Sequence, residues 1–377
     1  VAVGDGAGQL LEEFDLAHTA AGFAGFFSRI GRLRGRDKAA VSVAMEGFNG
    51  WARPLDSAVL AHGWKLYNVN NLKLARYKEI FPAPAKTDAI DARRILELFH
   101  LRADLALARG VLQQIVVLTQ EAERLKRLTR RRRQLVNEKV RVVNRMHSDL
   151  QAVCPGLLAI TTDVDNLWFL SLLRAREDIR KLARVRPGSL RALEGVGRTY
   201  CAKIQAWQRE ALFSHEVEWA GPMIVADATR VLALKNEIGT LDQAIEPLTD
   251  ACENARRLRT MPGFGRICSA ELAGEIGAIE RFGSEASLAL YLGMAVLDNS
   301  SGTHTGTKRS RQVNRRAKAA MMIAVARHME QVPRSRAYYD KKRAQGKTHN
   351  QAVRALGRQL VRVIWSMLKH QRDYELR

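Results

Sequence analysis

The chain has 377 residues, enough for two or three domains, and its 46% hydrophobic content can fill several cores. Its 61 lysine and arginine residues outnumber 39 aspartate and glutamate residues. The formal net charge of +22 favours a polyanionic partner, with nucleic acid as the leading candidate and a membrane surface as the rival. No apolar run is long enough to span a bilayer, and no signal peptide is found. The four cysteines are far apart and lack metal-ligand spacing, which predicts reduced thiols in an intracellular protein.

Residues 1–105 show the alternation of strands and helices that is typical of an α/β domain. A turn signal at residues 5–8 separates a strand that ends at Val3 from a returning strand. Short apolar strands then alternate with helices, which predicts a parallel or mixed sheet. The expected elements are a hairpin formed by residues 1–3 and 9–14, helices at 19–33 and 54–62, and strands at 41–45 and 64–69.

Three acidic residues of this domain lie where chemistry is expected. Glu46 follows the strand 41–45, at the carboxyl end where α/β sheets usually carry functional groups. Asp88 and Asp91 are three apart in a predicted helix with Thr87 as N-cap, so they share one face with the apolar Ile95. A carboxylate pair on a core-facing stripe usually has a cation or a metal between its members, because an unpaired buried carboxylate is costly. The simpler alternatives are an exposed helix start that serves the helix dipole and, for Glu46, a surface glutamate.

Together, these acids predict a site for divalent cations. Carboxylate oxygens with open positions suit Mg²⁺ or Mn²⁺. Two such ions about 4 Å apart can clamp the attacking and leaving oxygens of a phosphodiester, as in an RNase H-like nuclease core. Such a core generally has a further acid on its first strand, whereas Asp5 follows that strand and lies in the turn.

The middle of the chain, residues 106–255, is expected to form long coiled-coil helices. A helix at about 112–150 keeps a seven-residue apolar repeat. A second helix after Pro222 has a clean apolar seam, which predicts pairing within the chain or in a homo-oligomer; Pro247 should bend or end it. The first helix carries a basic run with few balancing acids, for which we expect phosphate contacts rather than an ordinary solvated face. This run is Arg130, Arg131, Arg132 and Arg133.

The last region, residues 256–377, is mostly helical in pattern and holds two motifs. The segment Met261–Gly265 looks like a helix-hairpin-helix turn, in which Gly263 and Gly265 would let backbone N–H groups approach a phosphate. A plain structural hairpin is the alternative.

The second motif is the pair Ser301-Gly302 in a loop rich in basic residues. A serine held against a phosphate by guanidinium groups can act as a nucleophile, although serines are common in loops. The basic residues that follow are Lys308, Arg309, Arg311, Arg315 and Arg316.

With these motifs at both ends, the chain resembles the DEDD-type transposases of bacterial insertion sequences. That family includes the bridge-RNA-guided recombinases and the related Piv-type DNA invertases. The specific combination is the string Lys-Thr-Asp-x-x-Asp-Ala-Arg at residues 86–93 with a Ser-Gly loop far downstream. The other matching segments are Met45–Gly47, Gly50–Leu55, Asn68–Asn70, Met261–Gly265, Arg281–Phe282, Tyr291–Gly293, Asn314–Arg316, Ala337–Tyr339 and Gly346–Lys347.

The resemblance implies a two-part active site. Glu46, Asp88 and Asp91 match three of the family's four acids, which hold Mg²⁺ or Mn²⁺; the first acid is expected upstream of the first residue of this chain. Ser301 matches the family's nucleophile, with Ser300 as the fallback, and attacks a DNA phosphate to form a phosphoserine.

The resemblance also implies the domain organisation and the partners. The expected domains are an RNase H/RuvC-like domain at 1–105, a helical coiled-coil region at 106–255 and a helical transposase domain at 256–377. The expected partners are donor and target DNA, a non-coding guide RNA encoded by the element, and further copies of the chain in a dimer or tetramer. The expected location is the bacterial cytoplasm. The residues leave two alternatives open: a metal-dependent junction nuclease with a structural Ser301, and a non-enzymatic architectural protein that binds nucleic acid.

Overall fold

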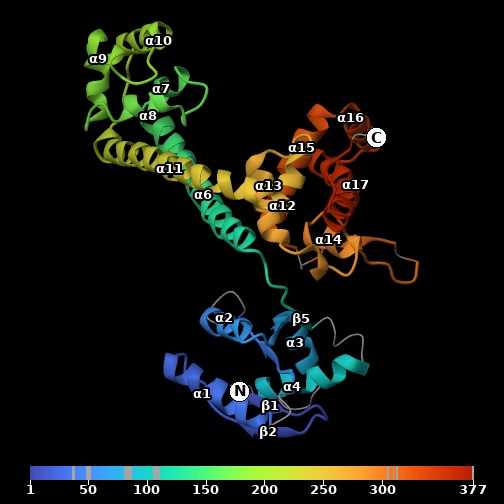
Figure 1. Cartoon of the computed structure of the whole chain (residues 1–377). Helices are drawn as coiled ribbons and strands as arrows, with labels where there is room; N and C mark the ends of the chain where they lie inside the picture. The colour runs from blue at the N-terminus through green and yellow to red at the C-terminus, as the bar shows by residue number, and fades with distance from the viewer. Residues whose placement is uncertain are drawn as a thin grey trace. The chain divides into compact units, whose positions relative to one another are not determined.

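The computed structural model describes residues 1–35, 39–47, 52–79, 87–104, 111–303, 305–308, 310 and 313–375. The chain forms two compact units, Val1–Val117 and Leu118–Arg377, and each is described by itself (Figure 1). The first unit is α/β, and the second is almost entirely helical. Of the middle region expected at 106–255, residues from 118 onward lie in the second unit together with the whole C-terminal region expected at 256–377.

The strands of the first unit form two small sheets. β1 (Ala2–Gly4) and β2 (Leu10–Glu13) are antiparallel, as the turn signal predicts. β3 (Ser42–Met45) is parallel to β4 (Lys65–Val69), and β5 (Leu112–Gln114) pairs with the other edge of β4 in the antiparallel sense. The sheet is therefore mixed. The prediction of a helix from residue 112 is wrong, because Leu112 enters the sheet beside Val69.

Helices cover both faces of β4. α1 (Ala20–Leu33) and α2 (Arg53–Ala61) form one core with Leu66 of β4. α3 (Asn71–Lys78), which the sequence did not predict, and α4 (Asp88–Asp104) form another core with Tyr67 and Val69. Because successive strand residues point to opposite faces, one short apolar strand supplies both cores.

Two long helices dominate the second unit. α6 (Gln120–Val153), capped by Thr119, and α11 (Val217–Ala251) pack against one another along their length (Figure 1). The apolar repeat places Leu125, Leu135, Met146, Ile224, Val231, Leu234 and Ile245 in fully buried or nearly fully buried positions. Of the two alternatives that the sequence left open, the structure shows pairing within the chain. Pro247 does not end the second helix, which continues to Ala251.

Shorter helices surround one end of this pair. They are α7 (Pro155–Ala159), α8 (Leu167–Leu173), the 3-10 helix η1 (Ile179–Arg184), α9 (Pro187–Arg191) and α10 (Arg198–Arg209), drawn in green in Figure 1. Their apolar residues share a core with α6 and α11.

The C-terminal helices form a separate core at the other end of the pair. This core includes Ala122 and Leu125 of α6 and Ile245 of α11. The long helices thus connect the two cores of the second unit. The C-terminal elements are α12 (Glu253–Arg259), α13 (Arg266–Ile276), η2 (Ile279–Arg281), α14 (Glu285–Tyr291), β6 (Leu297–Asp298), β7 (Thr307–Lys308), α15 (Arg315–Gln331), α16 (Pro333–Ala344) and α17 (His349–Lys369).

The search of the described residues for a helix both long and apolar enough to cross a bilayer finds none. The four cysteines are free thiols, as their spacing predicts; Cys154, Cys201 and Cys252 are buried and Cys268 is half-buried.

Candidate active site and nucleic-acid interface

Two of the candidate acids of the first unit are exposed at the ends of elements. Glu46 directly follows β3, at the carboxyl end of the parallel strand pair. Asp88 is the first residue of α4, and the Thr87 hydroxyl accepts a hydrogen bond from the Ile90 N–H at 3.3 Å, as an N-cap does. The prediction that Asp88 faces the core is wrong, because the buried part of α4 lies farther along, at Leu98.

Asp91, one turn farther along α4, already has a cationic partner. Its side chain is 19% exposed, and its carboxylate lies 2.5 Å from the Nζ of Lys78, the last residue of α3. The cation that the sequence predicts beside this carboxylate is therefore a lysine in this structure.

The three acids have the right chemistry for a hard divalent cation, since carboxylate oxygens are the ligands that Mg²⁺ and Mn²⁺ prefer. Their positions in the structure, however, do not form such a metal site. Over the part of the chain that the structure describes, no group of three or more His, Cys, Asp or Glu side chains is placed to hold a metal ion. The structure does not bring Glu46, Asp88 and Asp91 together, and their role as ligands stays a prediction.

The candidate nucleophile lies in an exposed hairpin of the second unit. β6 and β7 are antiparallel, and the Asn299 N–H donates to the Gly306 carbonyl at 2.8 Å. The Ser300 hydroxyl accepts a hydrogen bond from the Gly306 N–H at 3.3 Å, which helps to close the hairpin. Ser301 is exposed at the tip, next to Gly302, whose φ of +56° is the left-handed conformation that glycine favours. The hairpin thus presents the Ser301 side chain outward.

The basic residues predicted around this serine divide into three groups. Lys308 ends β7 and is exposed. Arg315 and Arg316 begin α15, the first exposed and the second half-buried. Arg309 and Arg311 lie outside the described residues.

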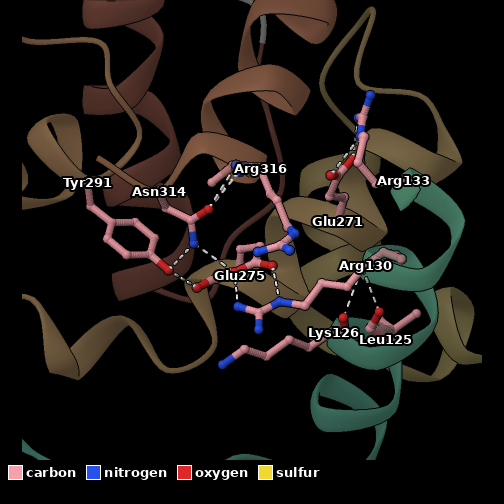
Figure 2. Close-up of polar contacts among 11 residues, drawn as sticks. Leu125, Lys126, Arg130, Arg133, Glu271, Glu275, Tyr291, Asn314 and Arg316 are labelled. Atoms are coloured by element: carbon pink, nitrogen blue, oxygen red, sulfur yellow. Dashed lines mark hydrogen bonds and ion pairs between the residues drawn. The ribbon is translucent and has the colours of Figure 1, made fainter. Parts of the chain in front are cut away.

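The arginine run of α6 faces two carboxylates of α13 (Figure 2). Arg130 donates to Glu275 from Nε at 2.6 Å and from a terminal nitrogen at 2.9 Å. Arg133 makes the same two-pronged contact with Glu271, at 3.1 and 2.5 Å. Glu275 and Glu271 are almost completely buried, so their charges depend on these guanidinium groups.

The other two arginines contact α11 instead. Arg132 pairs with Asp242, and a terminal nitrogen of Arg131, whose side chain is 58% exposed, lies 3.9 Å from Glu237. The expectation that few acids balance this run is wrong, because the balancing acids come from distant segments. Phosphate contacts by these four arginines therefore compete with internal ion pairs. The exposed basic residues of α6 also include Arg124, Arg127 and Arg141.

The pair between Arg130 and Glu275 keeps a buried carboxylate charged. Burial by itself raises the pKa of Glu275, but the hydrogen bonds and charge of Arg130, together with a hydrogen bond from Asn314, hold the pKa below its ordinary value. A carboxylate with a lowered pKa stabilises the folded state above about pH 4.5, its ordinary value, and loses this contribution as the pH falls through the folded-state pKa.

A Glu275→Gln variant is therefore expected to unfold more easily. It removes the buried charge and leaves Arg130 without its partner. We expect a loss of about 2–4 kcal/mol, somewhat less than the roughly 3–5 kcal/mol of a fully buried pair, because the Arg130 side chain is 35% exposed. Chemical denaturation followed by circular dichroism measures this loss. The matched control is Glu246→Gln in the exposed pair with Arg266, expected to cost less than about 1 kcal/mol. Equal losses in the two variants would contradict a structural role for the buried pair.

The Met261–Gly265 turn packs against the protein itself. A Cβ at Gly263 would lie 2.2 Å from the backbone N of His328 in α15, so the glycine permits a close approach of two backbone segments. This favours the structural hairpin over a phosphate contact for Gly263. Gly265 is exposed at the start of α13, and a Cβ there would meet nothing within 4 Å.

Sequence reasoning missed Glu271 and Glu275, which lie within a helix predicted from its small residues. A detectable signal was present: the two acids are four apart on an otherwise apolar helix, so they share one face and require cations when buried. Arg130 and Arg133, three apart on α6, have a matching spacing.

Comparison with known protein families identifies the class of protein to which this chain belongs. A transposase family model, the DEDD type of IS110 elements, matches residues 1–155, and the model of the IS116/IS110/IS902 transposase family matches residues 255–340. The chain is thus a transposase with a DEDD domain, which implies an RNase H-like N-terminal fold, and a second transposase domain that contains the serine hairpin.

The relatives are proteins of bacterial insertion elements, and two of them match most of the chain. The chain is 30% identical over 349 residues to the uncharacterized 42 kDa protein of IS900 from Mycobacterium paratuberculosis, which covers 90% of this chain and 85% of that protein. It is 28% identical over 323 residues to the 44.8 kDa protein of IS116 from Streptomyces clavuligerus, covering 83% and 79%. The transposase of IS1111A from Coxiella burnetii matches 39% of the chain at 23% identity. The chain belongs to the IS110/IS116/IS900 family of transposases.

Proposed function

We propose that this transposase cuts and rejoins DNA through a covalent phosphoserine formed by Ser301. The observation that carries the proposal is the hairpin geometry. Ser300 and Ser301 are both exposed in this hairpin, but the Ser300 hydroxyl accepts a hydrogen bond from the Gly306 N–H that helps to close it. Lys308, which pairs with Leu297 in the same hairpin and is exposed, adds positive charge to it.

In the proposed step, the Ser301 oxygen forms a bond to phosphorus, and the bond from phosphorus to one bridging deoxyribose oxygen breaks. The serine proton leaves, and a proton is gained by the departing oxygen. Because the phosphoserine keeps the energy of a phosphodiester, a free DNA hydroxyl can attack it and restore the serine. Rejoining then needs no nucleotide cofactor.

Glu46, Asp88 and Asp91 are the residues that we propose hold the divalent cation, Mg²⁺ or Mn²⁺. When bound, such an ion neutralises charge at the reacting phosphate. Their exposed or half-buried carboxylates, and their match to the family's motif, support this assignment. Asp91 must exchange Lys78 for the cation.

Replacing one of these acids tests the assignment. Asp88→Asn is expected to lower the Mg²⁺-dependent strand-joining rate by about a hundredfold or more, because a neutral amide is a much weaker ligand than a carboxylate. The rate is measured on a labelled DNA substrate over a Mg²⁺ titration. Asp15→Asn, an exposed aspartate of the same unit, is the matched control and should react as the parent does. A full rate in Asp88→Asn, with the same Mg²⁺ dependence, would refute the ligand role.

We also propose that a non-coding RNA from the element guides the protein, acting as a dimer or tetramer on chromosomal DNA in the bacterial cytoplasm. The net charge of +22 supports binding of RNA in addition to DNA. Purification from cells that carry the native flanking DNA should yield one defined RNA transcribed next to the gene. The control is the same purification without flanking DNA. Only heterogeneous cellular RNA in both samples would contradict RNA guidance and favour a protein-directed invertase.

A further inference from the structure

A polar cluster joins the two ends of the segment that carries Ser301. This anchoring cluster consists of Arg130, Glu275, Tyr291 and Asn314, which Figure 2 shows meeting around the Glu275 carboxylate. The segment comprises residues 292–313, so Tyr291 directly precedes it and Asn314 directly follows it. The Asn314 N–H donates to the Tyr291 carbonyl at 2.9 Å, so the backbone closes on itself at this point.

Asn314 uses every polar atom of its side chain. Its Oδ1 accepts from the N–H groups of Arg316 and Ala317 at 3.0 and 3.1 Å and so caps α15. Its Nδ2 donates one proton to Glu275 Oε2 at 2.7 Å and the other to the Tyr291 hydroxyl at 2.6 Å. A residue engaged in this way has its rotamer fixed.

The remaining members complete the cluster. The Tyr291 hydroxyl donates to the Glu275 backbone carbonyl at 2.8 Å. Arg130 holds the Glu275 carboxylate from α6, the long helix. Packing reinforces the closure: a Cβ at Gly293 would lie 2.8 Å from a methyl group of Val313, so the two flanks of the segment are in contact. Beyond this base, the hairpin around Ser301 is exposed.

We infer that the anchoring cluster positions Ser301 for attack, with Asn314 and Tyr291 as positioning residues. This inference rests on the proposed function of Ser301. A nucleophile on an exposed two-stranded hairpin has few contacts of its own, so its placement depends on the base of the hairpin. Displacement of a reacting group by about 1 Å lowers a reaction rate by roughly a hundredfold. The hydrogen bonds that hold the foot of the hairpin are therefore expected to affect the rate of strand joining.

Two conservative variants test the inference. Tyr291→Phe removes only the hydroxyl, and Asn314→Ser keeps an N-cap acceptor but loses the Nδ2 donor. Both are expected to join strands about tenfold to a hundredfold more slowly while binding DNA within about twofold of the parent. Trypsin cleavage after Lys308 in the folded protein should become roughly tenfold faster, because a loosened hairpin opens more often.

The matched control is Tyr339→Phe, which removes a hydroxyl that hydrogen-bonds to His349 at 2.8 Å on helices away from the hairpin. It should leave joining and cleavage after Lys308 unchanged. Cleavage or joining in the test variants equal to that of this control would overturn the inference. Ser301→Ala is measured in parallel: if it still joins strands, the proposed nucleophile is wrong, and the cleavage assay alone then decides whether the cluster anchors the hairpin.

Discussion

A Ser301→Ala variant is expected to lose covalent attachment to DNA, with strand joining at least about a thousandfold slower than in the parent protein. The alanine lacks the oxygen that forms the bond to phosphorus, and water cannot replace it without ending the reaction in hydrolysis. The measurement is a time course with end-labelled DNA, in which the protein–DNA adduct is separated on a denaturing gel. Binding of the same DNA should be unchanged, since the substitution removes one exposed hydroxyl.

The matched control is Ser300→Ala, one residue away. It removes a hydroxyl that accepts one hydrogen bond from Gly306, worth about 1 kcal/mol, so adduct formation should stay within about fivefold of the parent. An adduct that persists in Ser301→Ala and disappears in Ser300→Ala would assign the nucleophile to Ser300. Cleavage by the parent protein with free ends and no adduct would instead favour a metal-dependent junction nuclease.

A Gly263→Ala variant is expected to lower the free energy of unfolding by at least about 3 kcal/mol, through strain and overpacking combined. The φ of Gly263 is +79°, which is unfavourable for alanine, and the added Cβ would lie 2.2 Å from the His328 backbone N. Neither backbone segment can move without disturbing the C-terminal core. Denaturant-induced unfolding of the full chain, followed by circular dichroism, measures this loss.

Gly265→Ala is the control for this experiment, two residues away in the same turn. Its Cβ would meet nothing within 4 Å and its φ is −61°, so the expected loss is below about 1 kcal/mol. A stable Gly263→Ala protein that binds DNA more weakly would restore the phosphate interpretation of this glycine. A stable variant with unchanged binding would contradict both interpretations.

Much of the fold follows from local patterns. The turn signal at residues 5–8, the apolar strand ending at Val69 and the N-cap Thr87 each correspond to an observed element, because each depends on residues close in sequence. The apolar repeats of α6 and α11 likewise predicted most of the buried side chains, although Leu128, Ile238 and Leu241 are only half-buried, since helical periodicity sets a helix face. The short strand β5 escaped prediction because β4, with which it pairs, lies more than 40 residues earlier.

The sequence predicted which residues belong to the candidate site, but not which residues lie beside them in the fold. A motif identifies Glu46, Asp88 and Asp91, but it carries no information on which neighbour each carboxylate meets, and Asp91 meets Lys78. The arginine run shows the same limit: composition near Arg130 indicated uncompensated charge, whereas the buried Glu275 that compensates it is 145 positions away. Charge balance depends on which residues lie close together in the folded protein, and a short stretch of sequence does not show this.

The sequence by itself determined most of the elements, the net charge and the family of this transposase, because these depend on residue types, on spacings and on motifs that can be compared directly. Only the tertiary structure decided what the glycine turn contacts, which arginines have internal partners, and that Tyr291 and Asn314 close the base of the segment carrying Ser301. The physical reason is that close backbone approach and buried ion pairing arise between segments far apart in the chain, where only packing sets the distance.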